Sequence, residues 1–161
     1  LEEELEAVDN YIYILNVRFA GDIHFSKKVE CDVENVRVPS MILQPVVENA
    51  VNHGIRNIDW EGHIDLSVER WNDHIEISVR DNGLGMTGEQ IQRVLSKKVH
   101  SSSGEGDSTG IGMNNVISRL ELYYERDGLM EIYSEGEGMG TEVVINIPLE
   151  RSEKNVQNPD C

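Results

Sequence analysis

Apolar residues recur along the chain with two periods, one typical of helices and one typical of strands. Near the N-terminus they alternate spacings of four and three residues, and Gly21 ends this pattern. The spacing predicts a helix that forms either a coiled-coil seam with a partner helix or the inner face of an amphipathic helix packed on its own domain. So short a repeat does not decide between them. The seam consists of Leu1, Leu5, Val8, Ile12, Leu15 and Phe19.

Strict alternation of apolar and polar residues predicts two β-hairpins. The runs "HIDLSVERW" (63–71) and "HIEISVRDN" (74–82) both alternate, and Asn72-Asp73 between them is a turn signal. The runs "LMEIYSEG" (129–136) and "TEVVINIP" (141–148) flank the glycine-containing segment "EGMG" and predict the second hairpin.

The stretch "VPSMILQPVVENAVNHGI" (38–55) predicts a buried helix, because its apolar residues fall three and four apart. Pro39 suits the first turn of this helix, and Gly54 suits its end. Pro45 lies further in, where it is expected to remove a hydrogen bond or introduce a bend.

Three further elements complete the predicted order. Residues 23–29 suggest a short strand, and Thr87 is placed to cap a short helix that contains Val94. Residues 110–124, "GIGMNNVISRLELYY", have a continuous apolar face and predict a strong helix. This succession predicts an α+β fold, a two-layer α/β sandwich with helices on one face of a mixed sheet.

The charge balance limits the kinds of ligand that the surface attracts. The chain carries 14 basic and 30 acidic residues, a formal net charge of −16. This excludes a basic nucleic-acid surface and docking on anionic lipid. An anionic ligand must therefore be held by backbone N–H groups, a metal ion or a few lysines. With two cysteines, the chain has no disulfide framework and suits a reducing compartment such as the cytosol.

Four polar side chains on the predicted buried helix suggest a binding site. Glu48, Asn49, Asn52 and His53 share the same turns as its apolar residues. Leaving such groups buried without partners costs roughly 1–3 kcal/mol each. We therefore expect this helix to bind a polar ligand.

Two glycine motifs are ambiguous when each is taken alone. "DNGLGM" (81–86) allows close approach of the backbone to a flat ligand, or simply a type I′ hairpin turn at Asn82-Gly83. "TGIGMNN" (109–115) suits phosphate at a helix N-terminus, or is a plain helix start capped by Ser108 or Thr109. Residues 96–109, which precede this helix, are small and polar and predict a mobile loop.

The order of the motifs is more specific than any one of them. An Asn on a buried helix, Asp-x-Gly-x-Gly, a loop, Gly-x-Gly on a helix and Gly-x-Gly-Thr (138–141) follow one another. Over residues 36–148 this order resembles the Bergerat (GHKL) ATP-binding fold of gyrase-type ATPases, Hsp90, histidine kinases and MutL. Within that superfamily the 38–55 segment, "NYIYILNVRF" (10–19) and the 110–124 segment look like the LytS/YesM-like sensor histidine kinases.

The resemblance implies a role for each motif in binding Mg²⁺ and ATP. Asn49 would be the Mg²⁺ ligand, and Asp81 would accept a hydrogen bond from the adenine amine, helped by Thr141 and a water. Glu48 would be the catalytic residue, through a local hydrogen bond or a contact with a Mg²⁺-bound water. The loop over residues 87–109 would be a lid. The remaining ATP-binding residues would be Asn52, His53, Gly83, Gly85, Met86, Lys98, Gly110, Ile111, Gly112 and Met113.

The resemblance also implies a domain organisation and partners. Residues 1–21 would end an upstream dimerisation or linker helix, 22–149 would form the catalytic ATP-binding domain, and 150–161 would be a disordered tail. The γ-phosphoryl group of Mg·ATP would pass to a histidine on the upstream helices and then to a response regulator. The full-length protein would be a homodimer in a bacterial cell membrane, with this part in the cytoplasm.

Two departures from the superfamily pattern affect the choice between functions. The hydrolytic members carry a Glu four residues before the Mg²⁺-binding Asn, and here Pro45 occupies that position. Many histidine kinases have a Lys where Asn52 stands. The alternatives are a hydrolytic ATPase of this superfamily, a non-catalytic nucleotide-binding regulatory module, and an α+β domain without a ligand.

Overall fold

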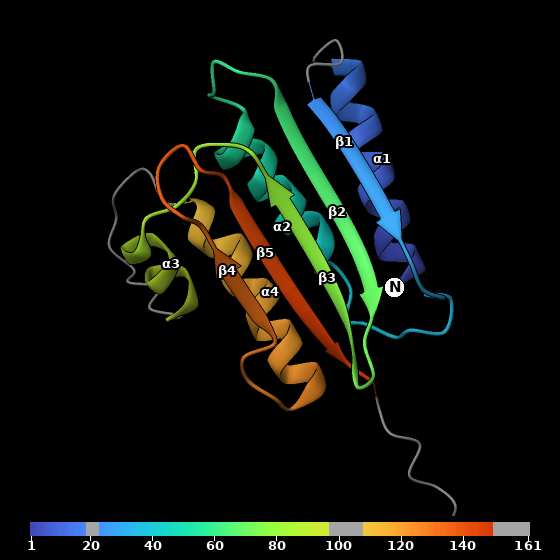
Figure 1. The fold of residues 1–161 in the computed structure, drawn as a ribbon. Helices are drawn as coiled ribbons and strands as arrows, with labels where there is room; N and C mark the ends of the chain where they lie inside the picture. The colour runs from blue at the N-terminus through green and yellow to red at the C-terminus, as the bar shows by residue number, and fades with distance from the viewer. Residues whose placement is uncertain (19–22, 97–107, 150–161) are drawn as a thin grey trace, which may run out of the picture.

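The computed structural model describes residues 1–18, 23–96 and 108–149, and Figure 1 shows its elements in chain order. The helical elements are α1 (Glu2–Arg18), α2 (Leu43–Asn49), the π-helical segment η1 (Ala50–Ile55), α3 (Gly88–Leu95) and α4 (Ser108–Tyr124). The strands are β1 (Ile23–Val29), β2 (Gly62–Arg70), β3 (His74–Asp81), β4 (Met130–Tyr133) and β5 (Thr141–Pro148).

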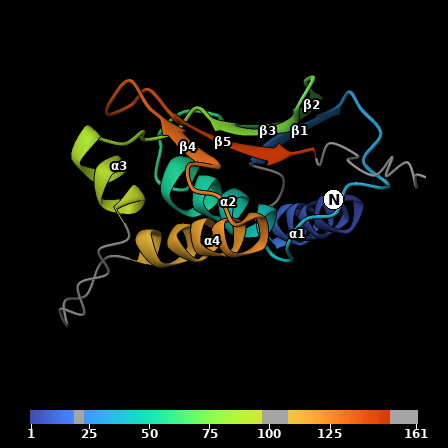
Figure 2. The same cartoon turned by 90° about the horizontal axis from the view of Figure 1, so that it is seen from below.

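The five strands form one mixed sheet in the order β1-β2-β3-β5-β4. β1 is parallel to β2, and the other neighbours are antiparallel. Figure 2 shows the helices together on one face of this sheet. The alternation in β2 explains this arrangement, because Ile64, Leu66 and Val68 point into the core while the residues between them face outward. The predicted two-layer α+β sandwich, both hairpins and the strand at 23–29 are confirmed.

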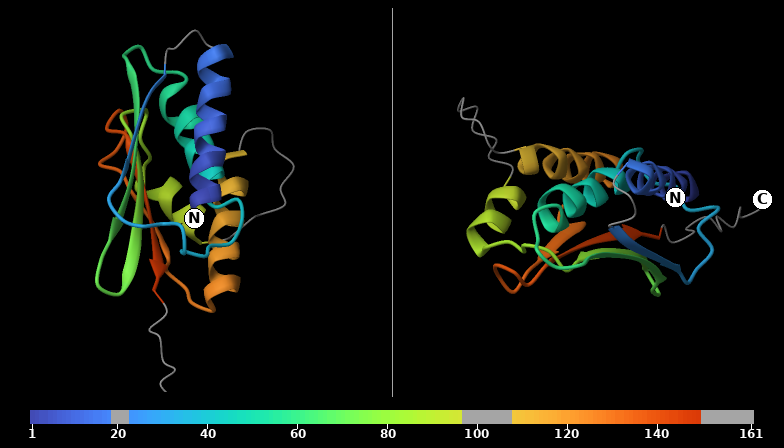
Figure 3. Two further views of the ribbon diagram at one scale, coloured as in Figure 1. Left: turned by 90° about the vertical axis from the view of Figure 1, so that its right-hand side faces the viewer. Right: turned by 90° about the horizontal axis from the view of Figure 1, so that it is seen from above.

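α1 packs on the same core as the other helices. Leu5, Val8 and Ile12 are buried against it, and Figure 3 shows α1 lying alongside the sheet and the remaining helices. Of the two interpretations of the N-terminal seam, the described chain shows the amphipathic helix packed on its own domain. The assignment of residues 1–21 to an upstream dimerisation helix stays a prediction.

The start of α2 differs from the sequence expectation. α2 begins at Leu43, so Pro39 lies outside the helix and Pro45 is its third residue. The first N–H groups of a helix have no intrahelical acceptor, and a proline there loses no hydrogen bond and forces no bend. The expected helix end at Gly54 is also corrected, because η1 continues to Ile55.

α3 and α4 follow the sequence prediction closely. The Thr87 hydroxyl accepts a hydrogen bond from the Gln90 N–H, and the Gln90 side chain accepts one from the Thr87 N–H, which together form a capping box. α4 buries Met113, Val116 and Leu120 against the core. Residues 97–107 of the predicted lid (87–109) and the tail (150–161) lie outside the described residues. None of the described helices is long and apolar enough to cross a membrane.

Candidate functional site

Asp81 is the last residue of β3, and its side chain is buried in the protein. The sheet register pairs it with Thr141, the first residue of β5. Its carboxylate accepts hydrogen bonds from the backbone N–H of Gly83, at 2.8 Å, and from that of Thr141. Burial raises the pKa of the Asp81 carboxyl above its ordinary value, and the two backbone hydrogen bonds lower it in part. A buried acceptor is therefore held at the end of a central strand.

Three glycines from separate segments enclose Asp81. A Cβ at Gly54, in η1, would lie 2.7 Å from the Asp81 carboxyl carbon. A Cβ at Gly83 would lie 2.0 Å from the Gly54 carbonyl oxygen, and one at Gly140 would lie 2.1 Å from the Asp81 carbonyl oxygen. Backbone hydrogen bonds join Leu84 N–H to the Gly54 carbonyl and Gly140 N–H to the Gly83 carbonyl. The three motifs that carry these glycines therefore meet around one carboxylate.

Ser134 fastens the loop after β3 to the loop before β5. Its hydroxyl accepts a hydrogen bond from the Met86 N–H and donates one to the Gly140 carbonyl, at 2.9 and 2.7 Å. Gly85 has a φ of +71°, and a Cβ there would lie 2.1 Å from the Gly136 carbonyl oxygen. Gly85 is thus required both for its conformation and for close backbone contact. No local pattern marks Ser134 as a site residue, because it stands at the end of a run that predicts a strand.

The alternative of a hairpin turn at Asn82-Gly83 is wrong. β3 pairs with β2 and β5, and the element that follows Gly83 is α3. The Asn82 side chain instead accepts a hydrogen bond from the His63 N–H and donates one to the Glu61 carbonyl. Asn82 therefore holds the segment before β2, and the glycines that follow it belong to the enclosure around Asp81.

Asn49 is placed where α2 passes into η1. Its side-chain oxygen Oδ1 is buried, and no described group donates a hydrogen bond to it. Asn49 shares this feature with Asn16 and Asn114 among the described residues, and each such atom calls for a ligand, ion or water. A neutral amide oxygen is also a ligand that Mg²⁺ accepts. The Asn49 side chain therefore fits the cation site that the sequence predicts.

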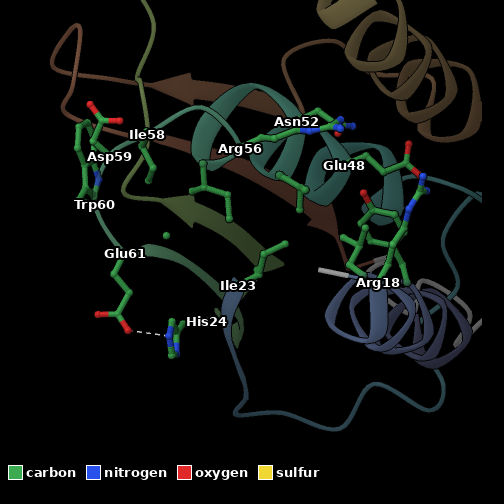
Figure 4. A pocket seen from close by; sticks show the side chains of 15 residues that line it. Arg18, Ile23, His24, Glu48, Asn52, Arg56, Ile58, Asp59, Trp60 and Glu61 are labelled. Carbon is green, nitrogen blue, oxygen red and sulfur yellow. Dashed lines mark ion pairs between the residues drawn. The ribbon is translucent and has the colours of Figure 1, made fainter. Parts of the chain in front are cut away.

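Glu48 and Asn52 face a different part of the molecule. Both line a pocket of about 880 Å³ between α1, η1, β1 and the segment before β2. In Figure 4 the Glu48 side chain extends from α2 toward α1. The Gln44 amide donates a hydrogen bond to Glu48. Burial, and after it the charge of Glu48, raises the pKa of Tyr11. His53 is exposed on η1. Contact of these three residues with nucleotide stays a prediction.

The predicted phosphate-binding residues lie at the start of α4. Gly110 and Ile111 are in its first turn, and Gly112 and Met113 follow directly. The free N–H groups and the positive dipole end of a helix start favour an anion there. Contact of these four residues with phosphate stays a prediction. Lys98, the other predicted phosphate contact, lies outside the described residues.

Comparisons with known proteins show the family of this chain and relatives of similar sequence. The family described as histidine kinase-, DNA gyrase B- and HSP90-like ATPase matches residues 37–151. The chain is 28% identical over 162 residues to the sensor protein LytS of Staphylococcus saprophyticus, which covers 100% of this chain and 26% of that protein. It is 31% identical over 159 residues to the sensor histidine kinase YpdA of Escherichia coli, covering 94% of this chain and 25% of that protein. The chain thus spans about a quarter of the length of these relatives.

Solved structures show the same fold at lower sequence identity. The nucleotide-free catalytic domain of the histidine kinase ThkA superposes with a TM-score of 0.63 at 18% identity, covering 90% of this chain and 94% of that one. The mycobacterial sensor histidine kinase MprB superposes with a TM-score of 0.58 at 19% identity, covering 89% and 93%. These likenesses establish the arrangement of strands and helices.

Proposed function

Because the chain belongs to the family of histidine kinase-, DNA gyrase B- and HSP90-like ATPases, we propose that it is the ATP-binding catalytic domain of a sensor histidine kinase. The observation that carries this proposal is the buried carboxylate of Asp81 inside its three-glycine enclosure. A buried acceptor beside closely packed backbone suits a flat base that offers an exocyclic amine. Asp81 would accept a hydrogen bond from the adenine amine, and the Thr141 hydroxyl would contribute a second polar contact.

Asn49 would hold a Mg²⁺ ion that accompanies the nucleotide. The support is its unpaired buried Oδ1 and the preference of Mg²⁺ for one or two protein oxygens together with phosphates and waters. When bound, the ion would neutralise part of the triphosphate charge. The start of α4, with Gly110 and Gly112, would orient the phosphates through backbone N–H groups. A chain with a net charge of −16 needs such local devices to hold ATP.

The proposed reaction is transfer of the γ-phosphoryl group to a histidine elsewhere in the longer protein. The imidazole nitrogen would attack the γ-phosphorus, a P–N bond would form, and the bond to the bridging oxygen would break to release ADP. Such a transfer depends mainly on positioning and charge stabilisation. Pro45, four residues before Asn49, offers no base to activate water, which favours transfer over hydrolysis. We further propose a response regulator as the next acceptor, a homodimeric full-length protein and a membrane location for its sensor.

The binding step is tested by titrating ATP with and without Mg²⁺. The parent should bind Mg·ATP, and Asn49→Ala should weaken that binding by at least about tenfold because a direct metal contact is lost. In EDTA the two proteins should bind ATP equally. Asn57→Ala, which changes an exposed asparagine just beyond η1, is the matched control and should bind like the parent. If Asn49→Ala loses the same ATP affinity with and without Mg²⁺, Asn49 is not a metal ligand.

The transfer step needs the longer protein. Incubated with γ-labelled Mg·ATP, that protein should acquire acid-labile, base-stable label, and Asp81→Asn should abolish most of it. Steady release of free phosphate without any labelled protein would instead favour the hydrolytic ATPase. Binding with neither label nor phosphate release would favour a nucleotide-binding regulatory module.

A further inference from the structure

The helix that carries Asn49 has no N-terminal cap of its own. Its N-cap residue is Ile42, which provides no side-chain hydrogen bond, and the preceding Met41 has a φ of +59°. A positive φ is uncommon for a residue other than glycine and indicates a turn held by its surroundings. The first N–H groups of α2 therefore need an acceptor from another part of the chain.

Glu4 of α1 supplies that acceptor. Its Oε1 accepts a hydrogen bond from the Met41 N–H at 2.6 Å, and its Oε2 accepts bonds from the Ile42 and Leu43 N–H groups at 2.8 and 3.0 Å. One carboxylate thus satisfies three backbone donors at the start of a helix nearly forty residues away. A negative charge at this end also interacts favourably with the helix dipole.

The segment before α2 is held by α4 as well. The Arg119 guanidinium donates a hydrogen bond to the Ser40 carbonyl at 2.6 Å, and the Tyr124 hydroxyl donates one to the Arg37 carbonyl at 3.0 Å. We call residues 37–43 the junction segment, because α1 and α4 both fasten it.

The junction segment continues directly into the proposed nucleotide site. α2 and η1 form one uninterrupted helical run from Leu43 to Ile55, with Asn49 in its middle and Gly54 against Asp81. Asn49 is about 9 Å along the helix from Leu43. The C-terminal half of α1 is separated from η1 by the pocket of about 880 Å³. Glu4 supplies hydrogen bonds that connect α1 to the start of this helical run.

We propose that Glu4 is a positioning residue through which α1 sets the affinity of the nucleotide site. A displacement of α1 would move or release the three N–H groups, and α2 would carry that movement to Asn49 as a rigid helix. This inference rests on the proposed function, because it assigns a regulatory input to the same site. It gives a helix outside the nucleotide pocket a direct mechanical connection to the cation ligand.

Glu4→Gln tests the proposal, because glutamine keeps the size of the side chain but loses the charge and one acceptor. We expect Mg·ATP to bind about fivefold more weakly, a typical size for residues that couple sites without touching the ligand. In EDTA, which removes Mg²⁺, the difference in ATP affinity between Glu4→Gln and the parent should be smaller, because the substitution acts through the proposed Mg²⁺ ligand Asn49. Glu3→Gln removes the same charge from the exposed side of α1 and should leave the affinity unchanged. Affinities are measured at a temperature where circular dichroism shows each variant to be fully folded.

A merely structural role predicts a different result. In that case Glu4→Gln lowers the free energy of unfolding while the folded protein binds Mg·ATP as tightly as the parent, and this outcome overturns the inference without affecting the proposed function. A parent that fails to bind Mg·ATP overturns both. If Glu4→Gln does not fold, hydrogen exchange of the parent replaces it. Saturating Mg·ATP should then slow exchange at Met41, Ile42 and Leu43, and unchanged exchange at these amides would count against the coupling.

Discussion

Replacing Asp81 with asparagine tests the adenine contact and the electrostatics of the site together. Asparagine has nearly the same shape, but it carries no charge and presents an N–H₂ group at one of the two oxygen positions. In the parent, both oxygens belong to a buried carboxylate that already accepts two backbone N–H groups. The fold can therefore remain while the proposed acceptor for the adenine amine is weakened.

The magnitude follows from the kind of hydrogen bond that is lost. A hydrogen bond to a charged group contributes roughly 1.5–3 kcal/mol, which corresponds to about a 10- to 150-fold change in affinity. We expect Asp81→Asn to bind Mg·ATP more weakly by a factor in this range. Asp127→Asn removes the same charge at an exposed position beyond the C-terminal end of α4 and should bind like the parent.

A base analogue separates loss of the contact from general damage. Isothermal titration with ATP and with the triphosphate of unsubstituted purine riboside, which lacks the exocyclic amine, measures discrimination between the two bases. The parent should prefer ATP, and Asp81→Asn should lose most of that preference. If the variant discriminates as well as the parent, Asp81 does not read the amine and the assignment of the pocket is refuted.

The raised pKa of Asp81 adds a pH test in the protein without nucleotide. Because burial raises this pKa, the folded state binds more protons than the unfolded state between the ordinary pKa, 3.8, and the raised value. The contribution of Asp81 to the free energy of unfolding must then fall as the pH rises through that window. Denaturant titrations of the parent and Asp81→Asn should show the parent losing stability relative to the variant as pH increases above about 4. If the parent instead gains stability relative to Asp81→Asn as the pH rises, the two backbone hydrogen bonds lower the pKa of Asp81 by more than burial raises it.

Two further predictions concern the framework around the site. Gly83→Ala places a Cβ against the backbone of Gly54, so we expect it to reduce the free energy of unfolding by about 3 kcal/mol, whereas Gly88→Ala has open space and should be neutral or stabilising. Urea unfolding compares the two, and a fully stable Gly83→Ala would contradict the enclosure of Asp81. Thr87→Ala removes the capping box of α3 and should reduce the free energy of unfolding by about 1 kcal/mol, while Thr87→Ser keeps the hydroxyl and most of the stability. Equal unfolding midpoints for these two Thr87 variants would show that the hydroxyl does not stabilise α3.

The elements that sequence predicted well are those specified by local pattern. Both hairpins have uninterrupted alternation, α3 has its cap and capping-box partner within four residues, and α4 has a continuous apolar face. Each of these signals depends on residues that are neighbours in the chain. The register of Asp81 against Thr141 also agrees with the predicted order of motifs, because both are placed at strand ends.

The features that sequence did not predict depend on contacts between distant segments. The local pattern predicts the N-terminus of α2 near Pro39, because the acceptor that caps it, Glu4, belongs to another helix and no local residue marks the position. Asn82-Gly83 has the composition of a hairpin turn, and only the neighbouring η1 shows that the glycine is needed for backbone contact. The π-helical turn that places Gly54 over Asp81 has no periodic signature in so short a stretch.

With Asp81 and Thr141 in the roles proposed for them, their pairing also links nucleotide binding to the folding of the whole domain. Asp81 and Thr141 are sixty positions apart in the chain. Gly54, which is one of the three glycines around Asp81, comes from a segment that precedes both. No contiguous piece shorter than about residues 54–141 contains these parts, so partial folding yields no binding site. Closing such long loops is slow compared with forming helices and hairpins. A ligand that requires the complete enclosure binds only the folded state, and at a hundred times its dissociation constant it adds about 2.7 kcal/mol to the free energy of unfolding. For such a protein the cellular concentration of ATP would control its lifetime as well as its activity.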